Sequence, residues 1–306
     1  MKRSLGRRAW NRVEYGALRA AIGLLNLFPD RLAEAAGAAL GRFGYWPLRI
    51  RRRQAEENVR LAFPERDEAW VQRVVRASYE HLGREAVVIL RLPTKSPEEL
   101  LARTRVEGLD RAAAHLDAGL GIVVCAGHFG NWEMGAAMIP PRGYPVDAIV
   151  TRQQNPLFDG YIVRTRKRLG IGIIRRGGAT EAATRAIREG RPVAFAADQN
   201  ANRSGLFVPF FGRLASTHRG AALIAVRTGA PMFLALPTRQ PDGSYVMRLD
   251  EVPFEREGEL EDVVWRGTAA FTARLEAAIR ELPEQYLWQH RRWKTRPPAE
   301  RNLPPG

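Results

Sequence analysis

Hydrophobic positions follow two different rhythms along this chain of 306 residues. In roughly the first third they recur at helical spacing, which predicts helices within 12–30 and 32–40, a helix that ends at Pro64, and another from Asp67 to about residue 91. From about residue 104, short apolar runs alternate with longer amphipathic segments. This alternation predicts an α/β fold in which helices cover a mostly parallel or mixed sheet.

The predicted strands are short, apolar and regularly interrupted by helices. They lie at 105–107, 121–126, 146–151, 171–174, 192–197, 231–237 and 245–249. The main helices between and after them are predicted at 156–169, 179–189, 217–228 and about 260–282. We see no internal repeat or low-complexity linker, so the simplest organisation is one α/β domain, 66–306, preceded by a helical region, 1–65.

One stretch combines a buried strand with polar residues that could do chemistry. An apolar run ends at Gly127, His128 follows, and Glu133 lies in a segment that resembles a helix start. Inside one helix, His128 and Glu133 would lie on opposed faces, so they converge only if His128 sits in the turn before the helix. Gly127 and Gly130 supply the backbone freedom for that turn. A histidine can accept a proton near neutral pH, and a carboxylate on its far nitrogen would fix the tautomer. The alternative is an ordinary polar pair.

The chain is strongly basic. Lys and Arg number 48 against 33 Asp and Glu, which gives a formal charge of +15. A surface of this kind suits an anionic partner such as nucleic acid, an anionic membrane or an acidic carrier protein. The single cysteine, Cys125, excludes an internal disulfide, is typical of a reducing compartment, and lies in a predicted strand, where we expect it to pack in the core.

The N-terminal region favours contact with a membrane. Its apolar helices are flanked by aromatic residues and by a group of arginines after Tyr45-Trp46-Pro47, a pattern suited to a lipid interface. The alternative is a basic amphipathic region packed on its own domain. No uncharged apolar run reaches the roughly 18–20 residues that a spanning helix needs, and no signal peptide with a cleavage site is visible, so export is not expected.

Other residues that could take part in binding or catalysis follow predicted strands. Arg152 follows one strand, where it could bind a phosphate or carboxylate or simply remain solvated. Asp198 follows another, where it could cap a turn or hold substrate and the loop in place. The sequence lacks the motifs of several other enzyme classes. The sequence has no Gly-x-Ser-x-Gly elbow, no His-Glu-x-x-His or other zinc spacing, and no nucleotide-binding glycine motif. We therefore expect no metal and no cofactor, and no nucleic-acid-binding module is visible.

Several of these segments resemble one family. His-Phe-Gly-Asn-Trp-Glu, residues 128–133, is similar to the His-x4-Asp/Glu motif of the late acyltransferases of lipid A biosynthesis, the lauroyl/myristoyl transferase family. Similar runs occur at 151–157 (Arg-x-x-x-Asn-Pro-Leu, with Arg164 and Arg166 further on), at 197–211 (Asp-Gln, then Val-Pro-Phe-Phe) and at 284–297. The resemblance extends from about residue 50 to residue 297.

The resemblance implies a glycerol-3-phosphate acyltransferase-like fold and direct transfer of a fatty acyl chain from an acyl carrier protein thioester to a hydroxyl of a lipid A precursor or related glycolipid. His128 would be the general base and Glu133 would orient it. The oxyanion would rest on N–H groups near Gly130 and Asn131 or on a nearby side chain. The implied location is the cytoplasmic face of the inner membrane. The residues expected to bind substrate are Asn131, Arg152, Arg164, Asp198 and Gln199.

Two other functions remain open at this level. One is a phosphatidylinositol mannoside-type or other glycolipid or phospholipid acyltransferase that uses acyl-CoA. The other is a non-catalytic basic protein that binds membranes or nucleic acid. The aromatic residues Phe207, Phe210 and Phe211 could line an acyl-chain groove or form plain core, and His290 is expected to be structural or interfacial.

Overall fold

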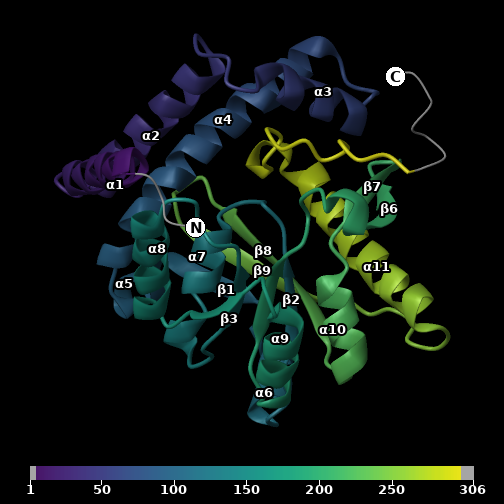
Figure 1. The fold of residues 1–306 in the computed structure, drawn as a ribbon. Helices are drawn as coiled ribbons and strands as arrows, with labels where there is room; N and C mark the ends of the chain where they lie inside the picture. The colour runs from purple at the N-terminus through teal and green to yellow at the C-terminus, as the bar shows by residue number, and fades with distance from the viewer. Residues whose placement is uncertain (1–4, 298–306) are drawn as a thin grey trace.

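A mixed sheet of seven strands lies at the centre of the molecule (Figure 1). The structure is a computed structural model that describes residues 5–297, so the expected domain limits at 1 and 306 lie outside the described residues. The strand order is β1-β9-β8-β2-β5-β3-β4, and only β8 and β9 pair antiparallel. These strands are β1 Thr104–Glu107, β2 Val123–Ala126, β3 Asp147–Val150, β4 Gly172–Arg175, β5 Val193–Ala196, β8 Met232–Arg239 and β9 Tyr245–Glu251.

Helices precede the sheet and then alternate with its strands. Those before it are α1 Leu5–Leu25, α2 Asp30–Tyr45, α3 Arg52–Ala62, α4 Glu68–Arg91 and α5 Pro97–Arg103. Those after β1 are α6 Leu109–Asp117, α7 Trp132–Ala137, α8 Pro156–Arg168, α9 Ala179–Arg188, α10 Gly220–Thr228 and α11 Leu260–Glu281. The predicted α/β architecture, with a largely parallel sheet covered by helices, is confirmed.

Local sequence signals explain most of these boundaries. Asp67 caps α4 by accepting a hydrogen bond from the Trp70 N–H at 2.7 Å, and Asn155 caps α8 in the same way. All seven predicted strands form within a few residues of their expected limits. The prediction missed a separate antiparallel hairpin, β6 Leu206–Phe210 and β7 Arg213–Thr217. Because Thr217 belongs to β7, the helix expected from 217 begins only at Gly220.

The two faces of the sheet carry separate parts of the core. Val123 and Cys125 of β2 are fully buried and pack in a cluster with α9, α10 and α11. The opposite face of the sheet packs with α6 and the end of α7 in a second cluster, which Val124 contacts. The expected core position of Cys125 is therefore confirmed, and burial raises the pKa of its thiol far above the ordinary value.

The N-terminal helices lie along α4, which crosses above the sheet in Figure 1. Glycines allow α2 and α4 to approach closely, since a Cβ on Gly41 would lie 1.9 Å from the Tyr79 carbonyl oxygen. Within residues 5–297, none of the helices combines the length and apolarity that crossing a membrane requires.

The chain leaves β2 and β5 towards different faces. β2 leads into α7, whereas β5 leads into the hairpin and α10. These two strands are parallel neighbours, with Ala126 opposite Ala196. Parallel strands whose connections diverge in this way open a crevice at their carboxyl ends. The crevice is the position at which a functional site is expected.

Candidate active site

His128 and Asp198 meet at the ends of these two neighbouring strands. The His128 Nδ1 lies 2.7 Å from Asp198 Oδ1, and the His128 backbone N–H donates to Asp198 Oδ2 at 2.8 Å. Asp198 is only 3% exposed. Two hydrogen bonds from one residue hold the carboxylate in a single orientation against the imidazole.

The hydrogen bonds fix the tautomer of His128. An ionised carboxylate only accepts hydrogen bonds, so Nδ1 carries the proton and, in the neutral ring, Nε2 is an acceptor. The Gln199 amide nitrogen lies 3.2 Å from Nε2 and can donate to it. Trp132 packs on the ring, with 4.8 Å between centroids. His128 therefore presents a basic Nε2 in an ordered setting, which is the form that a general base requires.

Burial and charge act in opposite directions on this pair. Burial lowers the pKa of His128, but the Asp198 carboxylate, with a smaller contribution from Glu133, outweighs burial and leaves the pKa above its ordinary value. Burial likewise raises the pKa of Asp198, but His128 and, more weakly, Arg292 bring it below the ordinary value. The arrangement stabilises an imidazolium facing a carboxylate.

The expected pairing of Glu133 with His128 needs correction. The Glu133 carboxylate accepts a hydrogen bond from Arg166 Nε at 3.0 Å and a second from the same guanidinium. The far nitrogen of His128 is occupied by Asp198 instead. The physical reason is direction, because Nδ1 points towards the end of β5 rather than towards the first turn of α7.

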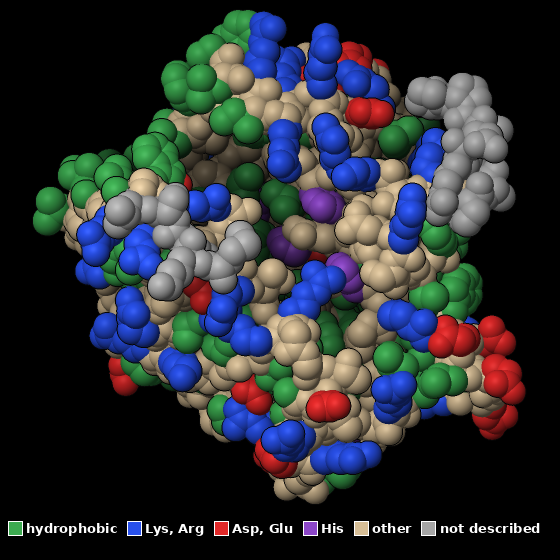
Figure 2. All heavy atoms as spheres, viewed as in Figure 1, with side chains coloured by type: hydrophobic (Ala, Val, Ile, Leu, Met, Phe, Trp, Pro, Cys, Tyr) green, Lys and Arg blue, Asp and Glu red, His purple; other side chains and the backbone are tan. Residues whose placement is uncertain are grey.

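His128 and Glu133 nonetheless line the same cavity, whose volume is about 480 Å³. Gln199 and Arg166 line it as well. Figure 2 shows a hollow in this face of the molecule, with histidine side chains inside it and Lys and Arg side chains around it. The basic nitrogen therefore faces a space that a substrate can enter.

Backbone contacts hold the turn that carries His128. Gly130 has φ of +58°, and a Cβ there would lie 1.7 Å from the Pro237 carbonyl oxygen, so only glycine fits. The Gly130 N–H donates to the Gln285 carbonyl at 2.8 Å and the Asn131 N–H to the Pro237 carbonyl at 3.0 Å. Both N–H groups are thus occupied, which corrects the expectation that they would bind an oxyanion.

Asn131 is also not placed to bind substrate. It is fully buried and caps α7, accepting from the Met134 N–H at 2.8 Å. Its amide donates at 2.5 Å to Glu85, a buried carboxylate on α4 that also accepts from the Tyr245 hydroxyl at 2.6 Å. Asn131 therefore has a structural role, which ties the start of α7 to α4 and β9.

The arginines expected to bind substrate lie outside the cavity. Arg152 is exposed and is not part of the cavity wall. Arg164 is also exposed and interacts with Tyr15 of α1. Arg166 does line the cavity, because two positions along a helix turn a side chain by about 200°. The sequence contained this signal as helical phase within α8.

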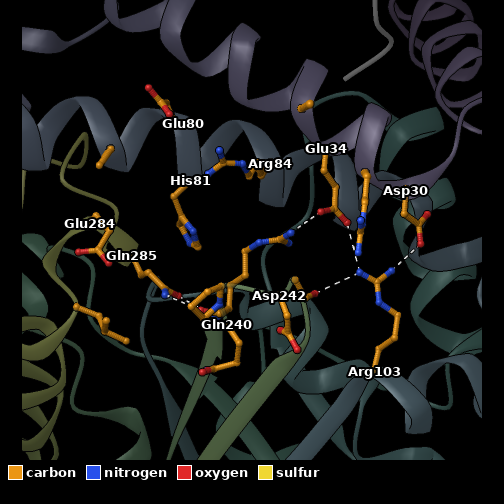
Figure 3. Close-up of a pocket in the computed structure, with 17 residues that line it drawn as sticks. Asp30, Glu34, Glu80, His81, Arg84, Arg103, Gln240, Asp242, Glu284 and Gln285 are labelled. Atoms are coloured by element: carbon orange, nitrogen blue, oxygen red, sulfur yellow. Dashed lines mark hydrogen bonds and ion pairs between the residues drawn. The ribbon is translucent and has the colours of Figure 1, made fainter.

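A second, larger cavity of about 1130 Å³ lies next to the same turn (Figure 3). His81 lines it, and the His81 Nε2 lies 3.4 Å from the Gly130 carbonyl oxygen. Some of its charged residues pair with one another, as with Arg103, which contacts Asp30 at 2.6 Å and Glu34 at 3.5 Å. His128 does not line this cavity, so the reactive pair is separate from it.

An apolar cavity of about 70 Å³ lies behind Trp132, between the sheet and α6 and α7. Trp132 lines both this cavity and the one that contains His128. The aromatic residues of the hairpin behave differently, because Phe210 and Phe211 are buried in the main core. For Phe210 and Phe211, core packing is therefore the role observed, whereas Phe207 is only partly buried and lies outside this core cluster.

The C-terminal segment contributes structure to the site. Tyr286 forms a β-bridge with Phe129, and the Leu287 N–H donates to the His128 carbonyl at 3.1 Å. His290 accepts from the Asn200 N–H at 3.0 Å and so has the expected structural role. This segment therefore holds both loops that carry the reactive pair.

Large apolar side chains are exposed along α1, α2 and the segment before α3. Figure 2 shows hydrophobic side chains gathered on this side, with Lys and Arg between them. Eleven of the seventeen exposed large hydrophobic residues in the described part of the chain lie here: Trp10, Val13, Leu24, Leu27, Phe28, Leu32, Leu40, Phe43, Trp46, Leu48 and Ile50. We call this set the N-terminal apolar surface. Large apolar side chains exposed together in this number are typical of an interaction site.

Comparison with known proteins gives a consistent result. The model of the bacterial lipid A biosynthesis acyltransferase family matches residues 12–295. The lipid A biosynthesis lauroyltransferase of Escherichia coli (strain K12) is 29% identical over 265 residues, 85% of each chain. The palmitoleoyltransferase of the same strain is 30% identical over 270 residues, 87% of this chain and 86% of that one. A phosphatidylinositol mannoside acyltransferase from Mycolicibacterium smegmatis is 30% identical over 161 residues, 51% of this chain and 52% of that one.

Proposed function

Because the chain belongs to the bacterial lipid A biosynthesis acyltransferase family and is an acyltransferase, we propose that it moves a fatty acyl chain from a thioester donor to a hydroxyl of a lipid A precursor or related anionic glycolipid. The observation that carries this proposal is the hydrogen-bonded His128–Asp198 pair, in which His128 lines a cavity and its Nε2 is not bound by the carboxylate. The names of the relatives describe a lauroyltransferase of lipid A biosynthesis and a phosphatidylinositol mannoside acyltransferase.

In the proposed reaction His128 is the general base. The acceptor hydroxyl hydrogen-bonds to Nε2 and transfers its proton there as its oxygen attacks the thioester carbonyl. Asp198 keeps the ring in the required tautomer and offsets the imidazolium charge. The tetrahedral intermediate then expels the thiolate as the C–S bond breaks, and the imidazolium returns the proton to sulfur. No acyl-enzyme is needed.

Gln199 is the proposed donor to the developing oxyanion. Its amide occupies Nε2 in the free protein, so an incoming hydroxyl that takes this position releases the amide. The freed N–H group can then donate to the carbonyl oxygen. Arg166, held by Glu133, supplies positive charge in the same cavity.

The acyl chain is proposed to enter the apolar cavity behind Trp132, whose walls are almost entirely hydrophobic. Its volume of about 70 Å³ requires neighbouring side chains to move when a long chain binds. We propose an acyl carrier protein thioester as the donor, since the net charge of +15 favours an acidic partner. The N-terminal apolar surface, with its arginines, is proposed to rest on the cytoplasmic face of the inner membrane.

A second candidate is transfer from acyl-CoA to a phosphatidylinositol mannoside or similar lipid. The similarity to the mycobacterial enzymes over about half the chain favours it. Swapping the two donors in one assay, with each acceptor, separates the alternatives.

The proposal is tested with His128→Ala and Asp198→Ala. We expect the wild-type protein to consume thioester and both variants to lose transfer while circular dichroism shows an intact fold. Mass spectrometry of lipid extracts from cells with and without the protein identifies the acyl chain and acceptor. Full activity of the His128 variant would contradict the mechanism, and absence of thioester consumption by the wild type would favour a non-catalytic binding protein.

A further inference from the structure

The cavity that contains His128 carries more positive than negative charge. Its ionisable lining residues, apart from His128, are Glu133, Arg166, Arg176, His218 and Arg219. Among these described residues Glu133 is the single carboxylate, and it is bound by Arg166. The remaining cations therefore lack a counter-charge on the cavity wall.

Arg176 is the most available of these cations. Its side chain is exposed, and none of the hydrogen bonds or ion pairs within residues 5–297 uses its guanidinium. Its backbone N–H donates to the Val150 carbonyl at 3.1 Å, which fixes the end of β4 against the end of β3. The guanidinium is thus carried by an anchored backbone and is free to bind a ligand.

Two neighbours extend this basic rim. Arg219 contacts Glu261 at 2.6 Å through one terminal nitrogen, whereas its Nε is buried and has no hydrogen-bond partner. Burial, and then the charge of Arg176, lower the pKa of His218, so its ring is neutral at pH 7. His218 and Arg176 line the same cavity. Thr180 also lines the cavity, and its hydroxyl can donate a hydrogen bond.

We propose that Arg176, assisted by Arg219, binds a substrate phosphate group at the rim of the catalytic cavity. This inference rests on the proposed function. A guanidinium can bind phosphate through two parallel hydrogen bonds, whereas a lysine ammonium acts as a point charge. An unpaired arginine is therefore well suited to this ligand. Two substrates can supply the phosphate: the phosphopantetheine arm of the thioester donor and a phosphorylated glycolipid acceptor. Either would be held while its reacting group reaches His128.

The donor arm of the test compares acyl-phosphopantetheine with acyl-pantetheine, which lacks only the phosphate. For Arg176→Ala we expect KM for the phosphorylated donor to rise about tenfold or more, because a hydrogen bond to a charged group contributes about 1.5–3 kcal/mol and 1.4 kcal/mol is a factor of ten. KM for acyl-pantetheine should not change. Arg176→Lys should recover part of the loss.

The acceptor arm compares a phosphorylated glycolipid acceptor with its dephosphorylated form, at a fixed concentration of acyl-pantetheine. An Arg176→Ala effect confined to the phosphorylated acceptor assigns the phosphate to the acceptor, and an effect confined to acyl-phosphopantetheine assigns it to the donor. Arg185→Ala is the matched control, since Arg185 is an exposed arginine of α9 that does not line the cavity. It should behave as the wild type with all four substrates.

The subsite is overturned if Arg176→Ala, folded by circular dichroism, has wild-type KM values for both phosphorylated substrates. The proposal is also overturned if Arg185→Ala raises the KM values for the phosphorylated substrates as much as Arg176→Ala does, because the effect would then come from overall charge. Failure of the proposed function looks different, since the wild-type protein would then turn over none of the substrates.

Discussion

At the scale of single residues, Asp198 sets the pH range in which His128 can act. Burial lowers the pKa of His128, and the Asp198 carboxylate raises it above the ordinary value despite that burial. The free imidazole is the base, so activity should rise as pH increases through this pKa. Asp198→Asn removes the charge, so the acidic limb of the kcat/KM profile should move to lower pH, while the maximal rate should fall by about 10²–10⁴.

The comparison variant for this prediction is Glu133→Gln. Glu133 contributes the weakest of the interactions that raise the pKa of His128, and it is bound to Arg166 rather than to the imidazole. Its removal should therefore shift the acidic limb less than Asp198→Asn does. Equal shifts in the two profiles would show that Asp198 is not the principal partner of His128.

The same pair links folding to pH. A raised pKa of His128 in the folded protein stabilises it below the unfolded pKa, and this contribution disappears as pH rises through the folded value. The lowered pKa of Asp198 acts in the other direction. It stabilises the folded protein at pH values above the unfolded pKa, and this stabilisation is lost as pH falls through the pKa of the folded protein. The two contributions coexist between the ordinary pKa values of a carboxyl group and an imidazole.

At the scale of elements, the turn between β2 and α7 is the feature that packing most constrains. Gly130 combines φ of +58° with a Cβ position 1.7 Å from the Pro237 carbonyl oxygen. Gly130→Ala should therefore destabilise the fold by more than the roughly 1–2 kcal/mol that a left-handed conformation costs an L-residue, and it should displace His128. Chemical denaturation gives the free energy of unfolding, and the transfer assay gives the activity.

Gly119→Ala is the matched control for this turn. Gly119 has a similar φ of +75°, but a Cβ there meets nothing within 4 Å. The free energy of unfolding of the Gly119→Ala variant should fall only by the cost of the left-handed conformation, and the variant should keep its activity. A Gly130 variant as stable and active as the Gly119 variant would mean that the turn adapts by shifting, and that its close contact with β8 is not needed.

The elements themselves were largely predictable from sequence, because strands and helices follow local hydrophobic periodicity. The hairpin of β6 and β7 was missed because Val208-Pro209-Phe210-Phe211 is apolar without regular alternation and contains a proline. The position of His128 in a turn before a helix was also predictable, because the apolar strand ends at Gly127 and the helix start begins at Asn131.

The partner of His128 was not predictable by the same means. Glu133 lies five residues away in sequence, whereas Asp198 follows β5, which is inserted between β2 and β3 in the sheet. Strand order in a sheet depends on tertiary packing, so local pattern does not reveal it. The only signal was that His128 and Asp198 both follow buried strands, whose carboxyl ends meet at one edge.

At the scale of the whole molecule, charge and exposed apolar surface are the two features proposed to bring the enzyme to its lipid substrate. The N-terminal apolar surface lies on α1, α2 and the segment after them, and exposed arginines lie between its members. Arginines attract anionic lipid from a distance that salt shortens, whereas apolar side chains contribute only on insertion. The two contributions are therefore separable by experiment.

Leu27 and Leu40 are the sharpest probes of insertion, being 77% and 66% exposed. The double variant Leu27→Ser and Leu40→Ser should bind phosphatidylglycerol vesicles at least about tenfold more weakly, because burying a leucine contributes about 1.5–3 kcal/mol. Leu120→Ser is the control. Leu120 is 55% exposed, but it lies before the amino end of the central strand β2 and is not part of the N-terminal apolar surface. Co-sedimentation at low and high salt should show the double variant losing the salt-resistant part of binding. If it binds as the wild type does at both salt concentrations, the N-terminal apolar surface is not inserted, and arginines alone hold the enzyme at the lipid.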